Sequence, residues 1–528
     1  MKIRNVLIVG GGTAGWMTAA ALLKLCPHIK TSLIESPDYP VSGVGESTLG
    51  QINEFFKLLD LKDEQWMAAT GATYKVNIRF NDFYQKGETW DYPFGSAETV
   101  VNKLPHGWMS WFVLNLTRPE KYHRGTFAEC FNSVGALAKY NKLSDDETHW
   151  NPWVDSAYHF DALKFGQWLK NNVCKRVKHI TGTVTGVIKK ENGDIDCVVY
   201  NGKTLSADLF VDCSGFKSLL LGEAMDVPFE SFHYNDGGCL LNDKAISISV
   251  PHENPEKEVT NTTNCTALDN GWVWDVPLWE RGGLGYVYSS NFISEDEAQV
   301  ELHNYLVKTR GKYRADQVSY RTIPFKMGKH KKSFVGNVIA VGLSNCFVEP
   351  LESTGLLVTH EQVIRLCNAL SGRRGFIPKV EKEMINQIAD HEIEGHKNFV
   401  AAHYAFSERK TDFWRTASEV VDYDFCGTDN LFMRYGSHKY INFDFLTNLG
   451  SIEYNDGPRY CAAGMGFNPI NKVTLPLSRM CNEIIPEEDE QALANAEKII
   501  DEWHQHMLEY CETLPSSYEF LNQTIYKE

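Results

Sequence analysis

The chain has 528 residues, of which 43% are hydrophobic and 23% charged, and these proportions exclude a disordered or fibrous protein. Its 52 Lys and Arg against 68 Asp and Glu give a net charge of −16, which disfavours nucleic acid and anionic membranes as partners. The 13 Cys form no CxxC pair, no apolar stretch approaches ~20 residues and no signal-peptide pattern precedes the first strand, so we expect a soluble cytoplasmic protein without a metal site, with a homodimer as the default assembly.

The N-terminal segment predicts a strand, a glycine turn, a helix and a second strand. Residues 6–9 are a short apolar run typical of a buried parallel strand, and residues 16–25 and 31–34 follow as helix and strand. The turn carries the spacing GxGxxG at Gly10, Gly12 and Gly15. In this spacing the first glycine allows a tight turn, the second lets backbone approach a pyrophosphate, and the third lets the helix pack on the strand.

Glu35 ends the second strand, twenty residues after the last of these glycines. An acid at this place accepts hydrogen bonds from an adenosine ribose, and its charge disfavours a 2′-phosphate. The segment therefore predicts a Rossmann-type site for FAD or NAD rather than NADP, with a glycine-rich turn that binds nothing as the alternative. No second such fingerprint occurs, so we expect reducing equivalents to arrive from elsewhere.

The rest of the chain continues an α/β pattern. Residues 72–80 alternate as a strand with Lys75 on its polar face, where a lysine taken alone is usually a solvated charge. The other predicted elements are an aromatic-rich irregular stretch at 85–155, a helix at 161–173, strands at 183–188, 196–200 and 209–212, a β-sheet region at 245–290, a strand at 337–342, a helix at 354–370 and mostly helical structure after 380. Without repeats or linkers, the chain predicts interleaved lobes.

Six motifs, in order over about residues 1–370, resemble the flavin-dependent halogenases of the tryptophan-halogenase type. They are GGGTAGWMTAA at 10–20, GVGEST at 43–48, AYHFDALKFGQWL at 157–169, DLFVDCSGF at 208–216, GWVWDVPL at 271–278 and GLSNCFVEPLESTG at 342–355. The resemblance implies a monooxygenase-like FAD lobe (the box) over 1–375, with substrate-facing segments inserted at about 85–155, and a mainly helical substrate lobe (the pyramid) over 376–528. It also implies FADH2 from a separate NAD(P)H-dependent flavin reductase, oxygen, a halide ion and a small aromatic substrate.

The resemblance assigns catalysis to Lys75 and Glu352. Lys75 stands at the place of the family's essential lysine in GATYKVNIRF, where an ammonium can hydrogen-bond hypohalous acid or a neutral amine can form a haloamine. Glu352 stands at the place of the assisting glutamate, where a carboxylate can stabilise and deprotonate a cationic arenium intermediate. Taken alone, Glu352 is an ordinary carboxylate at a helix entry.

The segment WVWDVP at 272–277 corresponds to the family's WxWxIP, with Val in place of Ile. Alternation along a strand places Trp272 and Trp274 on one side, and Pro277 stops the strand. The resemblance implies that these indoles separate flavin from substrate. An aromatic core strand is the alternative interpretation.

The remaining assignments concern the halide, the flavin and the substrate. The amides of Thr354 and Gly355 open a helix, a ready anion site, and in the family they bind halide. Family flavin contacts, besides the fingerprint, fall on Thr13, Ala14, Ser36, Ser47, Val184, Leu343 and Leu356. The expected substrate pocket comprises His106, Trp108, Trp111 and Ser353, although aromatic residues are as often core.

These assignments together predict a flavin-dependent halogenase acting on an indole, a tryptophan-like compound or a phenol. Bromide and iodide are expected ahead of chloride because they oxidise more easily. An FAD-dependent aromatic monooxygenase and a non-catalytic flavin-binding protein remain as alternatives, and neither requires the paired tryptophans.

Overall fold

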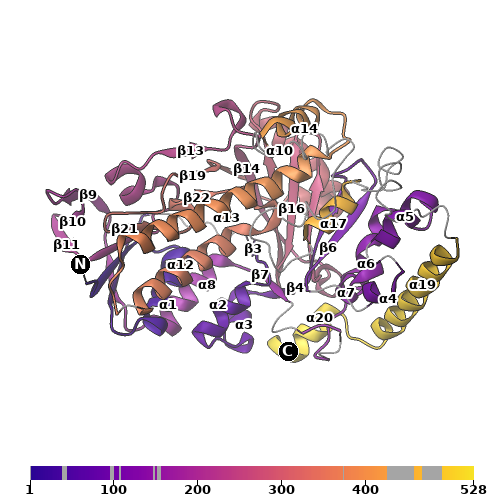
Figure 1. Ribbon diagram of the computed structural model, residues 1–528, viewed down its shortest axis with the longest axis horizontal. Helices are drawn as coiled ribbons and strands as arrows, with labels where there is room; N and C mark the ends of the chain where they lie inside the picture. The colour runs from indigo at the N-terminus through magenta and orange to yellow at the C-terminus, as the bar shows by residue number, and fades with distance from the viewer. Residues whose placement is uncertain are drawn as a thin grey trace. The chain divides into compact units, whose positions relative to one another are not determined.

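The computed structural model describes residues 2–38, 45–95, 100–105, 107, 109–146, 149–151, 156–372, 374–424, 457–466 and 490–527. They form a mixed α/β structure that divides into two compact units (Figure 1). Unit 1 consists of Met1–Ala72, His159–Gly237 and Pro324–His396, and unit 2 of Thr73–Tyr158, Gly238–Ile323 and Lys397–Glu528. Each unit is therefore assembled from three separate stretches of chain.

Unit 1 contains a six-stranded sheet in the order β20-β21-β12-β1-β2-β8. Its strands are β1 (Asn5–Val9), β2 (Lys30–Glu35), β8 (Lys178–Thr181), β12 (Leu209–Asp212), β20 (Phe334–Val335) and β21 (Val338–Ala340). Neighbours run parallel except β20 and β21. On one face Leu7 and Val9 pack with Ile195 and Val198 of β10, so a core lies between this sheet and a smaller one.

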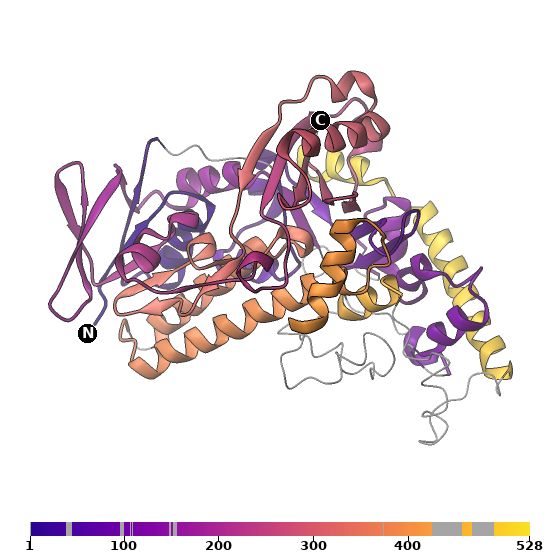
Figure 2. The same ribbon diagram turned by 90° about the horizontal axis from the view of Figure 1, so that it is seen from above.

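The smaller sheets and the helices complete unit 1 (Figures 1 and 2). One three-stranded sheet contains β9 (Val184–Lys189), β10 (Ile195–Tyr200) and β11 (Lys203–Ser206), another contains β13 (Phe229–Ser231), β19 (Gly328–His330) and β22 (Cys346–Phe347), and β3 (Glu46–Ser47) pairs with β7 (Ala157–Phe160). The helices are α1 (Thr13–Leu25), α2 (Ile52–Leu59), α3 (Asp63–Thr70), α8 (Ala162–Trp168), η2 (Leu169–Val173), η3 (Gly215–Lys217), η4 (Leu219–Ala224), η5 (Tyr234–Asp236), η6 (Gly342–Ser344), η7 (Pro350–Glu352), α12 (Thr354–Gly372) and the first part of α13 (Lys379–Ala405). Helices α1 and α12 pack against each other.

Unit 2 contains a seven-stranded sheet in the order β18-β14-β17-β16-β15-β5-β6. Its strands are β5 (Asn77–Asn81), β6 (Thr89–Pro93), β14 (Lys244–Pro251), β15 (Thr262–Ala267), β16 (Gly271–Pro277), β17 (Arg281–Tyr288) and β18 (Arg321–Pro324), and the short β4 (Thr73–Lys75) precedes them. The helices are α4 (Val100–Lys103), α5 (Met109–Thr117), η1 (Arg124–Thr126), α6 (Phe127–Phe131), α7 (Ser133–Tyr140), α9 (Pro255–Glu258), α10 (Glu295–Arg310), α11 (Lys312–Ala315), the end of α13, α14 (Asp412–Asp424), α17 (Gly457–Gly464), α19 (Glu490–Glu512), α20 (Ser517–Leu521) and η9 (Asn522–Tyr526).

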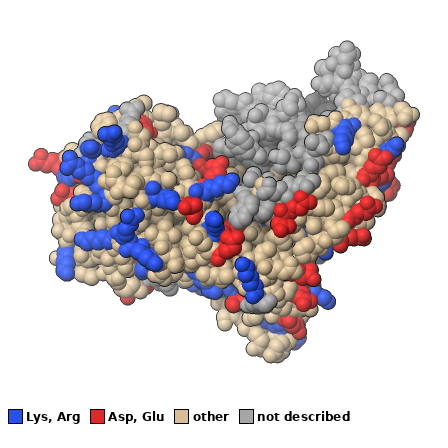
Figure 3. Space-filling model, turned by 90° about the horizontal axis from the view of Figure 1, so that it is seen from below, with Lys and Arg blue, Asp and Glu red and all other residues tan. Residues whose placement is uncertain are grey.

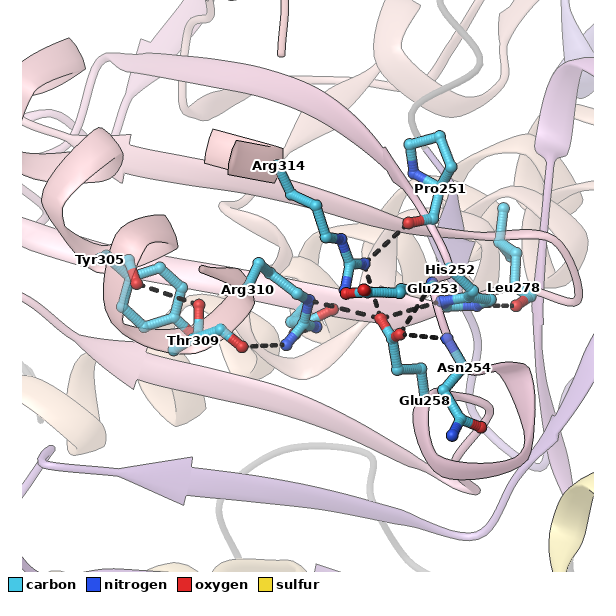
Figure 4. A network of polar contacts seen from close by, with 11 residues as sticks. Pro251, His252, Glu253, Asn254, Glu258, Leu278, Tyr305, Thr309, Arg310 and Arg314 are labelled. Carbon is cyan, nitrogen blue, oxygen red and sulfur yellow. Dashed lines mark hydrogen bonds and ion pairs between the residues drawn. The ribbon is translucent and has the colours of Figure 1, made fainter. Parts of the chain in front are cut away.

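A network of ion pairs connects α10 to β16 of this sheet and α11 to α9 (Figure 4). Arg310 of α10 pairs with Asp275 of β16, and Arg314 donates to Glu258 at 2.6 Å. Burial alone would raise the pKa of Glu258, but hydrogen bonds from Arg314 and from backbone N–H groups hold it at about 2. Since Asp275 lies between Trp274 and Val276, the network anchors the strand that carries the paired tryptophans.

Most predicted elements have the predicted type and differ at their ends by one to three residues. The strand over 72–80 is the main exception, because it breaks at Val76 into β4 and β5. Its polar face is also not solvated, since Thr73, Lys75 and Asn77 are all buried. The stretch 85–155 was expected to be irregular, yet its described residues form β6 and helices α4 to α7. Its apolar residues are too evenly spread to show a helical period.

Two further observations bear on the composition argument. Among the residues that the structure describes, no helix is long and apolar enough to cross a membrane. The cysteines of the described residues are all free and buried. The functional division into lobes at 1–375 and 376–528 stays a prediction.

Candidate functional site

The fingerprint glycines of unit 1 have three different surroundings. A Cβ on Gly10 (φ +120°) would lie 2.1 Å from the carbonyl oxygen of Cys213, and a Cβ on Gly15 would lie 2.0 Å from that of Gly10. A Cβ on Gly12, in contrast, would meet nothing within 4 Å. Gly10 and Gly15 are therefore required by packing, whereas Gly12 leaves an open cradle at the N-terminus of α1, as an approaching pyrophosphate requires.

Gly12→Ala is expected to separate ligand binding from folding. Its φ of −72° suits alanine and the added methyl group has room, so the melting temperature of the ligand-free protein should change by less than about 2 °C. FAD affinity should fall at least about tenfold, because the methyl group occupies the cradle. Titration calorimetry and a thermal melt check both. Equal FAD affinity in the variant would contradict a pyrophosphate site here.

Glu35 lies over this turn and contacts two basic side chains. Its Oε1 accepts from Lys170 Nζ at 2.6 Å and lies 2.7 Å from His179 Nε2. Its Oε2 would lie 1.8 Å from a Cβ on Gly11, so the carboxylate rests directly on the glycine turn. The sequence analysis did not identify Lys170 or His179, although both stand in a run without acidic residues.

Two other predicted flavin contacts gather at the ends of β2 and β9. Ser36 Oγ lies 2.8 Å from Thr183 Oγ1, next to Val184. Thr13 and Ala14 open α1, and Thr13 Oγ1 donates to the carbonyl of Ala162 at 2.8 Å, which connects the glycine turn to α8.

The turn before α12 brings the next group of predicted residues together. Ser353 adopts a left-handed conformation (φ +58°), and its hydroxyl donates to Ser47 at 3.1 Å. Glu352 is buried, with 1% of its surface exposed. Leu343, Thr354 and Gly355 line one small cavity, together with Gly342, Cys346, Phe347, Val348, Val358, Ile393 and His396. Leu356 is buried beside them and is not among the lining residues.

Gly355 faces open space, because a Cβ there would meet nothing within 4 Å. The amides at the start of α12 thus border a cavity that a large anion or a planar ring can approach. Asp212 stabilises the neighbouring turn by accepting from the backbone amides of Ser214, Leu220 and Leu221. Burial raises the pKa of Asp212, and these hydrogen bonds counteract the rise.

Glu46, in the GVGEST motif, makes the stability of unit 1 sensitive to pH. Burial, with a contribution from nearby Asp161, raises the pKa of Glu46 from 4.5 to about 7. The folded state therefore binds this proton more tightly, and the resulting stability is complete below pH 4.5 and is lost as pH rises through 7. We expect the melting temperature of the ligand-free protein to fall between pH 5 and pH 8 partly for this reason.

Glu46→Gln should flatten this pH dependence, and the exposed Glu54→Gln provides the matched control. Thermal melts across the pH range check both variants. A slope unchanged by Glu46→Gln would show that Glu46 does not bind the proton.

Lys75 of unit 2 ends β4 in an aromatic environment. Its side chain is fully buried, and Nζ lies 4.9 Å from the centroid of the Phe94 ring. Thr73, two residues earlier, donates its hydroxyl to the carbonyl of Pro277 at 2.7 Å. This bond joins the lysine strand to the end of the strand that carries the paired tryptophans.

Trp272 and Trp274 point to the same side of β16, as predicted from alternation. Their ring centroids are 6.3 Å apart at an interplanar angle of 61°. Trp274 lies flat on Gly285 of β17, where a Cβ would come within 2.0 Å of the indole. A glycine at this register position therefore allows the second indole to lie against the sheet.

The predicted substrate residues are only partly placed. Trp111 is buried in α5, where it packs with Phe112 and Phe127 and donates to Thr126 Oγ1 at 3.1 Å. These contacts are those of a core residue, and a role in substrate binding stays a prediction. His106 and Trp108 lie outside the described residues.

Comparisons of the sequence and of the structure with known proteins agree with one another. Residues 5–424 match the family model of tryptophan halogenase. The chain is 31% identical to tryptophan 6-halogenase ThaL of Streptomyces albogriseolus, over 99% of this chain and 98% of that protein. It is likewise 31% identical to tryptophan 7-halogenase RebH of Lentzea aerocolonigenes, over 99% of each. The solved structure of VirX1 superposes with a TM-score of 0.87 at 39% identity, covering all of both chains.

Proposed function

The chain belongs to the tryptophan halogenase family, and from this premise we propose that it halogenates an electron-rich aromatic compound with halide, oxygen and reduced FAD. Reduced FAD, when bound, supplies together with oxygen the oxidant that converts halide to hypohalous acid. The aromatic carbon then exchanges its hydrogen for the halogen, and water is released. The substrate class is an indole, a tryptophan-like compound or a phenol.

The observation that carries this proposal is the fit of unit 1 to FAD. The open cradle at Gly12 suits the pyrophosphate, and Glu35 suits the ribose hydroxyls. The cavity at Leu343, with the amides of Thr354 and Gly355 on its wall, suits a planar ring and an anion. These residues would hold FAD and halide in a monooxygenase-like box, with a helical pyramid for the substrate.

The remaining chemistry in this proposal belongs to Lys75, Glu352 and the paired tryptophans. Lys75 binds hypohalous acid through its side-chain nitrogen and orients the halogen, and its complete burial supports a role other than solvation. Glu352 stabilises positive charge that develops on the aromatic ring and accepts the proton that the ring loses. Trp272, Trp274 and Pro277 keep substrate away from the flavin, so that the oxidant is spent on halide.

The test is a reaction with purified protein, FAD, NADH, a generic flavin reductase and bromide, analysed by mass spectrometry. Indole, tryptophan and a panel of phenols serve as substrates, with iodide and chloride in parallel. A bromine isotope doublet on one substrate is the expected result. Hydroxylated product without halogen would instead establish the aromatic monooxygenase, and FAD binding without any consumption of reduced flavin would favour a flavin-binding protein.

A further inference from the structure

The acidic charge of this protein is unevenly divided between its two units. Unit 1 contains 24 Lys and Arg against 25 Asp and Glu, whereas unit 2 contains 28 against 43. Almost the whole net charge of −16 therefore belongs to unit 2. Unit 1 also contains the glycine fingerprint for FAD. Figure 3 shows Lys and Arg side chains gathered at the left of the face drawn there.

Within unit 1, one segment concentrates positive charge. Residues 162–190 contain seven Lys and Arg and no Asp or Glu. We call this stretch the basic segment; it comprises α8, η2, β8 and β9. Lys164, Lys175, Arg176 and Lys178 are exposed, so their charges act outward into solvent.

The basic segment lies against the phosphate-binding turn. A Cβ on Gly166 would come within 3.4 Å of the Cα of Thr13, and Cys174 Sγ lies 3.8 Å from the carbonyl oxygen of Trp16. The segment thus crosses the first turn of α1, whose free amides face the pyrophosphate of a bound dinucleotide. Strand β8 then runs parallel to β2 and ends beside Glu35.

Two members of the basic segment also contact Glu35. Lys170 and His179 both contact its Oε1, while their side chains lie 5.3 Å and 5.6 Å from the buried ring of Trp16. Side chains from η2 and β8 therefore meet at one carboxylate oxygen. Without the ammonium of Lys170, Glu35 would repel the phosphates of a dinucleotide bound at the adjacent turn more strongly.

We propose that the basic segment is a capture surface for the anionic pyrophosphate of reduced FAD, in which exposed cations speed association and Lys170 with His179 hold Glu35 in place. The proposal depends on the proposed function, because only an enzyme that takes reduced flavin from solution needs to attract it. FAD carries two negative pyrophosphate charges, and a protein of net charge −16 repels it at long range. The positive charges of the basic segment reverse this repulsion close to the phosphate-binding turn.

Attraction of FAD by the basic segment and repulsion by the net charge have opposite salt dependence. The direction in which the association rate constant changes with salt therefore distinguishes them. Screening lengths fall from about 30 Å at 0.01 M to about 8 Å at 0.15 M ionic strength. If the basic segment dominates, the association rate constant for FAD falls as salt is added. If the net charge dominates, the rate constant rises.

The experiment is stopped-flow binding of oxidised FAD to the full chain, followed by flavin fluorescence over this salt range. The variant Lys164→Glu/Lys175→Glu/Lys178→Glu should bind FAD about 5- to 10-fold more slowly at low salt, with the salt dependence abolished or inverted. The matched control, Lys57→Glu/Lys203→Glu/Lys379→Glu, changes net charge equally with exposed residues of the same unit that lie outside the basic segment. In this control the association rate constant should still fall as salt is added.

Lys170→Met tests the second part of the proposal. It should mainly raise the dissociation rate constant, by about tenfold, because it leaves Glu35 charged and less compensated beside the bound phosphates. Equal effects of the two triple variants, or association that accelerates with salt in the unaltered protein, would overturn the capture surface and leave the halogenase proposal standing. Absence of FAD binding in the unaltered protein would overturn both.

Discussion

Lys75→Met is expected to reduce halogenation at least about 100-fold while leaving the fold intact. Methionine keeps the length of the side chain but lacks the nitrogen that we propose binds hypohalous acid. Because Lys75 is fully buried, a thermal melt of the variant is needed to distinguish lost chemistry from lost stability. The measurement is product formation at saturating reduced flavin and bromide, together with a thermal melt.

Lys329→Met is the matched control for this experiment. Lys329 of unit 1 is also nearly buried, with 7% of its side chain exposed, and it forms ion pairs with Asp390 and Glu394 of α13. Its loss should destabilise the protein and leave the turnover of the folded fraction unaffected, whereas Lys75→Met should lower the turnover itself. Full halogenating activity in Lys75→Met would remove the lysine from the proposed mechanism.

Leu521→Ala is expected to lower stability by about 2–5 kcal/mol, which corresponds to a fall of roughly 3–8 °C in melting temperature for a unit of this size. Leu521 is completely buried at the end of α20, and it fixes a C-terminal segment that contacts β4 and the turn after β16. Phe520 packs against Tyr74, the neighbour of Lys75, at 6.2 Å. Tyr526 stacks on Trp279, two residues after Pro277, at 3.9 Å.

Differential scanning calorimetry checks this prediction, and near-ultraviolet circular dichroism reports the Trp279 stack. Gln523→Ala, an exposed position in η9, is the control and should stay within about 0.5 kcal/mol. If Leu521→Ala melts like the unaltered protein, the segment does not brace these strands.

The strand, glycine turn and helix at the N-terminus could be predicted from sequence because their geometry depends on local backbone. Gly10, Gly12 and Gly15 act through backbone spacing within one strand-turn-helix, so their separation alone specifies the geometry. The partners of Glu35 could not be found in this way, since Lys170 and His179 are more than a hundred residues away along the chain. Their contact follows from the parallel pairing of β8 with β2, which no local pattern encodes.

Lys75 is a second residue whose surroundings the local sequence did not predict. Alternation of polar and apolar residues indicated a half-solvated strand, yet both faces of residues 73–77 are buried. Helices and strands from distant parts of unit 2 cover them, including the C-terminal α20. Only the family resemblance directed attention to this lysine.

The threefold division of each unit along the chain has a consequence for biosynthesis. β1 needs β12 as its neighbour, and Val6 pairs with Leu209, so on the ribosome the first strand waits for about two hundred further residues, or roughly 10–40 s at ordinary elongation rates. β21, which pairs with β12 in the same sheet, emerges later still. Until then the apolar strands of the nascent chain have exposed edges, and we expect productive yield to depend on chaperones and on slow translation at low temperature.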